Sequence, residues 1–201
     1  MARTNRLLLW GALMAAGAAP VVAQSYSEGF TFLKAVRERD GATAERILSN
    51  PSSTAINIRD PSTGESALHI LVRGRDSGWL NYMLGRGARP DAAMNDGTTP
   101  LILAAQIGWV DGARSLLARG ANPNLGDRSG MTPLIVAVQR RDLQIVRLLL
   151  SRRADPNQTD NSSGNSAIDY ARQDSRSAAI LRELEQVRAR PAPAVASPPR
   201  N

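Results

Sequence analysis

His69 is the only histidine in this chain of 201 residues, and the chain contains no cysteine. A histidine can act as a general base or bind a metal ion, but each role needs a converging partner, such as a nucleophile or further ligands. The absence of cysteine excludes disulfides, thiolate metal sites and a cysteine nucleophile. We therefore expect His69 to be structural, and we expect neither a metal ion nor a cofactor.

Serine and acidic residues are plentiful, but their spacing matches no catalytic motif. The sequence contains no Gly-x-Ser-x-Gly, no glycine-rich phosphate-binding loop and no metal-binding run of aspartates. The carboxylate pairs Glu38/Asp40 and Glu183/Glu185 fit the solvated faces of helices. This pattern predicts a protein that is not an enzyme.

The positive charge lies mainly at the two ends of the chain. The formal net charge is +7, and Lys34 is the only lysine. Two arginines precede residue 24 and three follow residue 187, with no acidic residue in either end, so the part between them carries about +2. A nucleic-acid interface needs clustered charge on one surface. We therefore expect no nucleic-acid partner.

Positions 1–23 have the three-part pattern of a secretory signal peptide. Two arginines are followed by an apolar run from Leu7 to Val22, which ends in Val21-Val22-Ala23. We expect cleavage before Gln24, export to the periplasm and no stable membrane insertion after cleavage. An uncleaved anchor is the alternative, although about 16 apolar residues fall short of the roughly 20 that a spanning helix needs.

A period of about 33 residues organises the middle of the chain. The segment Gly97-Thr-Thr-Pro-Leu-Ile102 returns as Gly130-Met-Thr-Pro-Leu-Ile135, with weaker copies that start at Gly64 and Gly164. A second landmark, at 120–124, keeps the same phase in copies at 87–91 and 153–157. Two landmarks that recur together indicate a tandem repeat.

Each repeat has the pattern of two helices followed by a projecting turn. Thr99 and Thr132 suit helix N-caps, and each is followed by a proline at the first helical position, where no amide donor is lost. We expect helices over 101–107 and 134–140, each followed by a second helix with apolar residues at helical spacing.

The turn after each second helix has a position for a left-handed residue. Gly87 and Gly120 occupy this position in two repeats, and glycine adopts that conformation at little steric cost. Arg153 occupies it in the next repeat. We expect this arginine to carry a conformational cost that glycine would avoid.

These segments resemble the ankyrin repeat, whose pattern reads roughly D-x-x-G-x-T-P-L-H followed by G-A-D-x-N. The resemblance covers about residues 25–187 and implies an all-α solenoid of stacked helix-turn-helix units with short β-turn or hairpin fingers. It places His69 on the family's structural histidine, which bonds backbone across neighbouring loops. Because one unit cannot bury its apolar face alone, neighbouring units must share a core. The expected organisation is a signal peptide at 1–23, an N-terminal capping repeat at 24–59, a degenerate ankyrin repeat at 60–93, ankyrin repeats at 94–126 and 127–159, a C-terminal capping repeat at 160–187, and a disordered Pro/Ala/Arg tail at 188–201.

The resemblance also implies a protein partner, bound by the finger turns and the exposed face of the first helices. We expect a monomer that binds one unidentified protein. Trp109 either anchors that partner or packs over its own turn. Arg140 and Arg141 with Arg152 and Arg153 suggest a patch that suits an acidic partner. The residues carried over from the family pattern are Ser62, Thr63, Glu65, Arg73, Asn95, Asp96, Thr98, Gln106, Trp109, Arg128, Ser129, Met131, Gln139 and Arg140.

Two further functions remain as alternatives on the same scaffold. One is a cell-envelope protein that binds anionic lipid or polymer through its arginines and tail, which salt-sensitive liposome binding would reveal. The other is a secreted, host-directed effector, which would be found in the culture medium.

Overall fold

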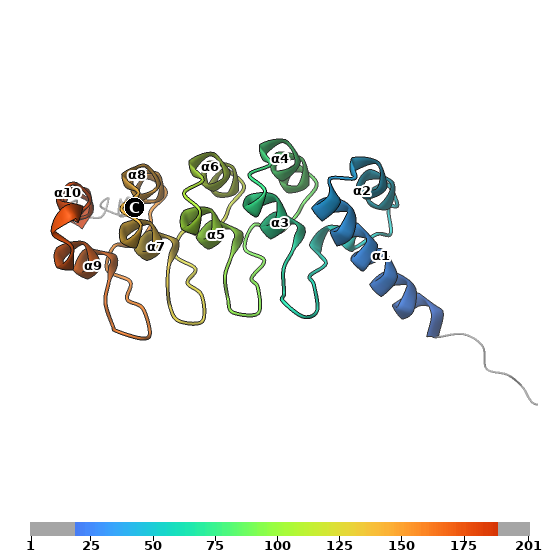
Figure 1. The fold of residues 1–201 in the computed structure, drawn as a ribbon, viewed down its shortest axis with the longest axis horizontal. Coiled ribbons are helices and arrows are strands. Elements are labelled where there is room, and N and C mark those ends of the chain that lie inside the picture. Colours follow the sequence, from blue (N-terminus) through green and yellow to red (C-terminus); the bar gives the residue numbers. More distant parts are fainter. Residues whose placement is uncertain (1–18, 189–201) are drawn as a thin grey trace, which may run out of the picture.

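Ten α-helices, arranged as five pairs, make up residues 19–188, the part of the chain that the computed structural model describes. Side chains are described from residue 28 to residue 187. Figure 1 shows two parallel rows of helices, with long turns projecting from the inner row. The inner row consists of α1 (Ala19–Glu38), α3 (Ala67–Arg73), α5 (Pro100–Gln106), α7 (Pro133–Gln139) and α9 (Ala167–Gln173). The outer row consists of α2 (Gly41–Leu48), α4 (Ser77–Gly85), α6 (Val110–Ala118), α8 (Leu143–Ser151) and α10 (Ala178–Arg188), and the 3-10 helices are η1 (Ala55–Asn57) and η2 (Ser175–Ser177).

The beginnings of the central inner helices follow directly from their sequence. The side chains of Thr99 and Thr132 accept hydrogen bonds from the amides of Ile102 and Ile135, and a proline follows each cap. These contacts satisfy amides that have no partner inside the helix. The two helices begin and end one residue earlier than predicted, so both predictions are confirmed.

The predicted left-handed turns are also present. Gly87 and Gly120 have φ angles of 92° and 88°, and Arg153 holds the equivalent position with φ 64°. A non-glycine residue in this region is disfavoured because its Cβ approaches the backbone. Arg153 therefore carries a conformational cost that the other two turns avoid.

The core runs unbroken through all five helix pairs. It extends from Phe32 in α1 to Leu184 in α10, and both of these side chains are fully buried. Leu101 and Leu134, which occupy equivalent positions in consecutive repeats, are also fully buried. Each inner helix packs on its own outer helix and on the neighbouring inner helices. The predicted all-helical solenoid is confirmed.

Four long turns, which we call the fingers, precede the inner helices α3, α5, α7 and α9. They comprise residues 60–66, 94–99, 127–132 and 160–166. In the described residues, isolated antiparallel bridges close only the first and last fingers, between Arg59 and Ser66 and between Thr159 and Ser166. The fingers are therefore tight turns with at most one bridge each.

Helix α1 is 20 residues long, whereas the other inner helices have seven. It runs through the predicted cleavage point after Ala23, and its described buried residues begin at Gly29. The rest of the predicted signal peptide (1–18) and the tail from residue 189 lie outside the described residues. Within the described part, no helix is both long and apolar enough to cross a bilayer.

Candidate functional site

The first and last fingers use their polar side chains internally. Asp60 accepts hydrogen bonds from the amides of Ser62 and Thr63 and from the Ser62 hydroxyl. The bonds from Ser62 lower the pKa of Asp60 to about 2. Of the predicted site residues, Ser62 and Thr63 are exposed, but both help to close their own turn.

The last finger repeats this arrangement with more partners. Asp160 accepts from the amides and hydroxyls of Ser162 and Ser163 and from the Tyr170 hydroxyl. The bonds from Ser163 hold the pKa of Asp160 far below its usual range. The extra residue in this turn, which lengthens the repeat, is thus accommodated by a carboxylate that binds both serines.

Neighbouring fingers are joined by a ladder of backbone and asparagine contacts. The Asn95 amide donates to the Thr63 carbonyl at 2.9 Å, and its side chain donates to the Ser62 carbonyl at 2.8 Å. Asn161 makes the same pair of contacts, with the carbonyls of Ser129 and Arg128. The side chain of Asn95, predicted to bind a partner, therefore has a structural role.

Arg128 stands where the other two fingers have asparagine. Its backbone amide donates to the Asp96 carbonyl at 3.0 Å, so the ladder continues through the main chain. Its side chain is exposed and has no hydrogen bond or ion pair among the described residues. Unlike these asparagines, Arg128 has a side chain that does not bridge two fingers and remains available to bind another molecule.

Four other predicted finger residues differ in accessibility. Thr98 is only 6% exposed, so a partner cannot reach its side chain in this conformation. Asp96 accepts from the Thr98 amide, which lowers the pKa of Asp96. Ser129 is exposed and Met131 is half-buried against the core.

Glu65 is the centre of an ion-pair cluster that joins the first helix pair to the first finger. It is only 9% exposed and binds Arg37 of α1 at 3.0 Å and Arg73 of α3 at 3.3 Å. Arg37 also binds Asp60 at 3.2 Å. The predicted site residues Glu65 and Arg73 are therefore engaged with each other. Sequence reasoning missed the role of Arg37, which is far from Glu65 in the sequence and carries no motif.

His69 has the structural role that was predicted. It is fully buried, its Nδ1 accepts from the Ser66 amide at 3.2 Å, and its Nε2 lies 3.0 Å from the Thr98 carbonyl. These partners require a neutral ring with its proton on Nε2. Burial lowers the pKa of His69. The ring therefore links the start of α3 to the next finger.

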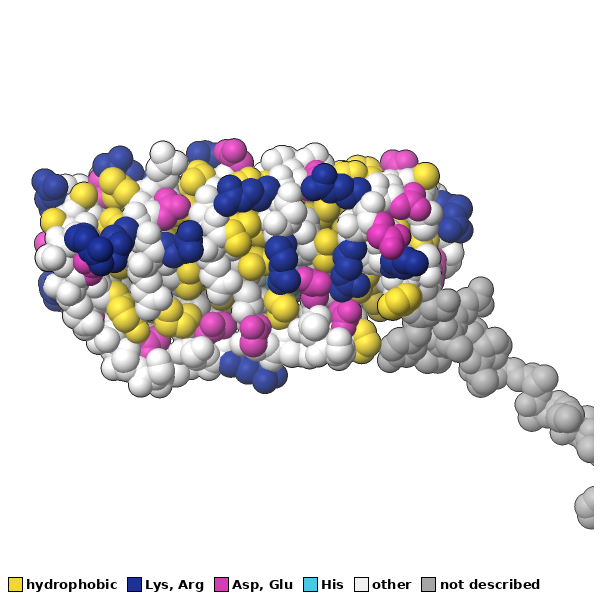
Figure 2. Space-filling model, in the orientation of Figure 1, with side chains coloured by type: hydrophobic (Ala, Val, Ile, Leu, Met, Phe, Trp, Pro, Cys, Tyr) yellow, Lys and Arg dark blue, Asp and Glu magenta, His cyan; other side chains and the backbone are white. Residues whose placement is uncertain are grey.

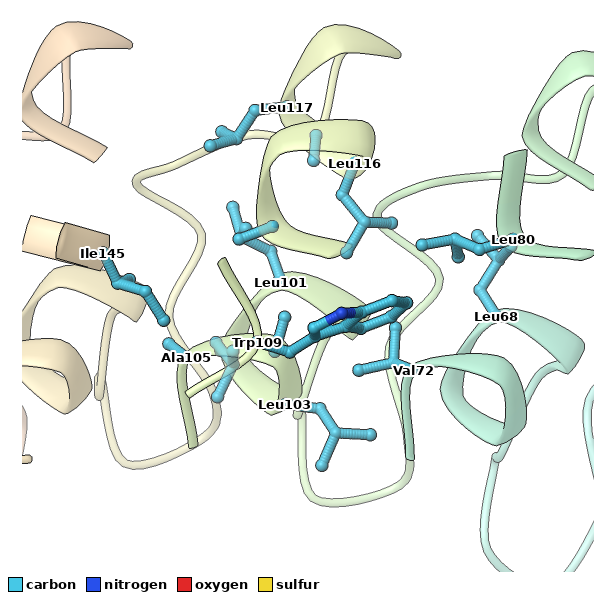
Figure 3. Close-up of a cluster of buried hydrophobic side chains, with 14 of the residues drawn as sticks. Leu68, Val72, Leu80, Leu101, Leu103, Ala105, Trp109, Leu116, Leu117 and Ile145 are labelled. Atoms are coloured by element: carbon cyan, nitrogen blue, oxygen red, sulfur yellow. The ribbon is translucent and has the colours of Figure 1, made fainter. Parts of the chain in front are cut away.

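Trp109 is core rather than surface. It is 7% exposed, and Figure 3 shows its ring among Val72, Leu103 and Leu116. A Cβ added at Gly112 would lie 2.0 Å from the indole, so that glycine makes room for the ring. The interpretation of Trp109 as a partner anchor is wrong, and the alternative, packing over its own turn, is correct.

The inner helices expose one polar row at the ends that face away from the fingers. Arg73, Gln106, Gln139 and Gln173 are the last residues of α3, α5, α7 and α9 and are all exposed. Arg73 is paired with Glu65, whereas the two central glutamines have no described hydrogen bond. Arg140 lies beside Gln139, is exposed and is also unpaired in the described structure.

The four arginines that were expected to form one patch lie in two places. Arg140 and Arg141 precede α8, while Arg152 and Arg153 follow it. The length of the helix separates the two pairs, which is roughly 13 Å along the axis. Arg141 is also bound to Asp174 at 2.6 Å, which helps lower the pKa of Asp174 to about 2. The prediction of a common patch is wrong because the nine residues of α8 lie between the two pairs.

Among the described residues, no group of three histidine or acidic side chains could hold a metal ion. Figure 2 shows Lys and Arg side chains spaced along the stack with acidic groups between them, while the fingers are mostly uncharged. The exposed side chains of the central repeats are therefore suited to contacts with another molecule at the protein surface.

A family model for ankyrin repeats (3 copies) matches residues 32–127, 68–160 and 113–184. The chain belongs to the ankyrin-repeat family. Ankyrin repeats indicate a protein–protein interaction module and are typically not enzymes. The part of the prediction that concerns repeat type, fold and interaction class is therefore confirmed.

One curated relative is similar to a segment of this ankyrin-repeat chain. It is oxysterol-binding protein homolog 1 of Saccharomyces cerevisiae, which is 34% identical over 85 residues. The match covers 41% of this chain but only 7% of the yeast protein. The likeness therefore concerns the repeats and not the activity of the larger protein.

Proposed function

We propose that this ankyrin-repeat chain is an exported adaptor that holds one protein partner on its two central repeats. The central face comprises Arg128, Met131, Gln106, Gln139 and Arg140. Arg128 carries most of this proposal, because it replaces a bridging asparagine and leaves its guanidinium free beside a half-buried methionine.

The charge of this face favours a partner that offers carboxylates opposite its two ends. Arg128 lies at the finger and Arg140 at the opposite end of α7, with uncharged side chains between them. Guanidinium groups bind carboxylates through two parallel hydrogen bonds. A partner with an apolar contact for Met131 and an acidic group near each arginine fits this arrangement.

The buried contacts of α1 are compatible with export. Cleavage before Gln24 would leave residues 24–38 of α1, and the described buried positions of this helix all follow Glu28. The mature chain would therefore keep its N-terminal cap. Intact-mass measurement of the chain from a periplasmic fraction tests this proposal, since a mass that includes residues 1–23 would contradict cleavage.

A crosslinked pull-down compares the central face with a control surface. The test variant carries Arg128→Ala, Met131→Gln and Arg140→Ala, and we expect it to lose the partner that the parent chain retains. The control carries Arg114→Ala, Gln144→Ala and Arg182→Ala on exposed positions of the outer helices, and it removes the same number of charges. Equal recovery by both variants would exclude the central face, provided that both melt like the parent chain.

A further inference from the structure

One long edge of the stack collects arginines that have no acidic partner. We call it the loop edge, which comprises residues 86–91, 119–124 and 152–157 after α4, α6 and α8. Arg86, Arg119 and Arg152 are the C-caps of these helices and recur at the same position of consecutive repeats. Arg89 and Arg153 belong to the same loops, and all five arginines are exposed.

The ion pairs of the described structure lie away from this edge. Arginines with carboxylate partners are Arg37, Arg73, Arg141, Arg147, Arg172 and Arg176. The loop edge contains two acids, and the carboxylates of both are used within the loops. Asp91 accepts from the Asn122 amide, and Asp155 accepts from the Asn157 amide. None of its five arginines makes an ion pair in the described structure, and five positive charges stand against two carboxylates on this edge.

Two of these arginines also join neighbouring repeats. Arg86 donates to the Leu48 carbonyl at the end of α2 and lies over the Tyr82 ring. Arg119 lies near Gly85, the last residue of α4. A cation at a helix C-terminus is favourable, which explains why these two positions hold arginine. Arg152, the C-cap of α8, is favoured for the same reason. The side chain of Arg89 has no such contact among the described residues, so this explanation does not cover it.

The loop edge also opens into a hollow whose lining contains two arginines and one aspartate. The hollow has a volume of about 580 Å³, and its lining includes Arg59, Arg89, Asp91 and Gly120. Arg59 donates to the Ala93 carbonyl, which fixes its guanidinium at this position. An anionic group could approach two guanidinium groups here.

The chain leaves the described structure from the outer row of helices. Helix α10 packs on α8 and ends at Arg188. The sequence beyond it contains Arg190 and Arg200 and no acidic residue.

We propose that the loop edge binds an anionic lipid surface and leaves the central face free for a protein. Consecutive helices pack about 8–10 Å apart, so the arginines form a row of separated cations along an edge of the stack. Guanidinium groups bind phosphates through paired hydrogen bonds. A row of cations on an edge is attracted to the negative surface of an anionic bilayer, to which each basic side chain near the surface contributes.

Vesicle co-sedimentation of the full chain tests the loop edge. The vesicles contain equal parts of phosphatidylcholine and phosphatidylglycerol, with pure phosphatidylcholine as the neutral control. We expect binding to the anionic vesicles only, and we expect it to weaken as salt is added. The double variant Arg89→Gln/Arg152→Gln should lower the partition coefficient about thirtyfold, at about 1 kcal/mol for each arginine.

The matched control removes two exposed arginines from the opposite edge. Arg39→Gln/Arg176→Gln makes the same change in net charge and should leave binding within a few-fold of the parent chain. Equal losses in the two double variants would overturn the proposal, because net charge alone would then explain binding. Absence of binding to the anionic vesicles would overturn it as well. Competition by soluble polyglutamate at equal charge would overturn it too, since the ligand would then be a polyanion and not a lipid surface.

The test is independent of the protein partner. The triple variant of the central face should bind anionic vesicles like the parent chain, because none of its residues belongs to the loop edge. Thermal melting of each variant shows that it remains folded. The chain truncated after residue 187 should retain the difference between the two double variants, because the described arginines supply that difference.

Discussion

The helices that follow the end fingers and those that follow the central fingers begin with different capping residues. At the ends, Ser66 and Ser166 cap their helices through capping boxes with His69 and Asp169. In the centre, Thr99 and Thr132 cap helices that continue with proline. The end helices therefore begin with a reciprocal pair of side chains, whereas each central helix begins with one threonine cap and a proline that has no amide to satisfy.

The fingers also differ in what they leave exposed. Asp60 and Asp160 bind the serines and threonine of their own turns. In a central finger Asp127 likewise accepts from the amides of Ser129 and Met131, but the side chains of Arg128 and Met131 make no hydrogen bond within the described structure. The comparison teaches that both kinds of finger keep an aspartate for their own turn, and that this central finger also presents side chains that its turn does not use.

The largest effect should come from the shared core of the central repeats. Leu134→Ala removes a fully buried side chain that has neighbours on both sides. We expect it to lower the free energy of unfolding by ~2–5 kcal/mol in urea denaturation. Leu184→Ala in α10 should cost less, because the end of the stack can relax into the space. A larger loss of stability in Leu184→Ala than in Leu134→Ala would contradict this difference between the centre and the end of the stack.

His69 should give an intermediate effect, because it is the buried link between an end repeat and a central finger. His69→Ala removes one of the two hydrogen bonds to the Thr98 carbonyl and leaves the Ser66 amide without its acceptor. We expect a loss of about 1–3 kcal/mol in the same assay. An unchanged stability would contradict the structural role.

The pH dependence of this link has a definite sign. Because burial lowers the pKa of His69 below its ordinary value of 6.5, the unfolded chain binds a proton more readily than the folded chain. Stability should therefore fall as the pH drops below 6.5, and this part of the fall should disappear in His69→Ala. A curve of the same shape for both chains would show that other groups are responsible.

Arg153 should give the smallest effect. Arg153→Gly removes the cost of a left-handed arginine, roughly 1–2 kcal/mol, although the greater freedom of glycine in the unfolded chain offsets part of it. We expect a gain of about 1 kcal/mol or less and a slightly higher Tm. Arg153→Ala, which keeps a Cβ in the same conformation, should show no such gain. Equal melting of all three chains would mean that the turn relaxes around arginine.

Most of the fold could be predicted because the residues that set each helix boundary lie at that boundary in the sequence. Thr99 with its proline, Gly87, Gly120 and the regular return of these landmarks are local signals, and each of them has the predicted structural outcome. Contacts between repeats were harder to predict. The pairing of Arg37 with Glu65 depends on the packing of α1 against the first finger, which no local pattern describes.

The candidate site was predicted less well because a match to a position of the family pattern does not specify whether the side chain there is buried. Trp109 is buried because Gly112 makes room for its indole, and Thr98 is covered although its position is exposed in the pattern. The two arginine pairs flanking α8 are near in sequence but lie at opposite ends of a helix. The length of α8 separates them.

The interface between the repeats at 94–126 and 127–159 bears on how many repeats the domain can contain. Its main parts are a backbone bond between fingers and apolar side chains at matching positions, and each repeat carries both. A duplicate of residues 94–126 inserted between them would meet complementary surfaces on either side. The length of this domain is therefore set by how many copies the gene encodes, and a longer version could be engineered to span a wider target.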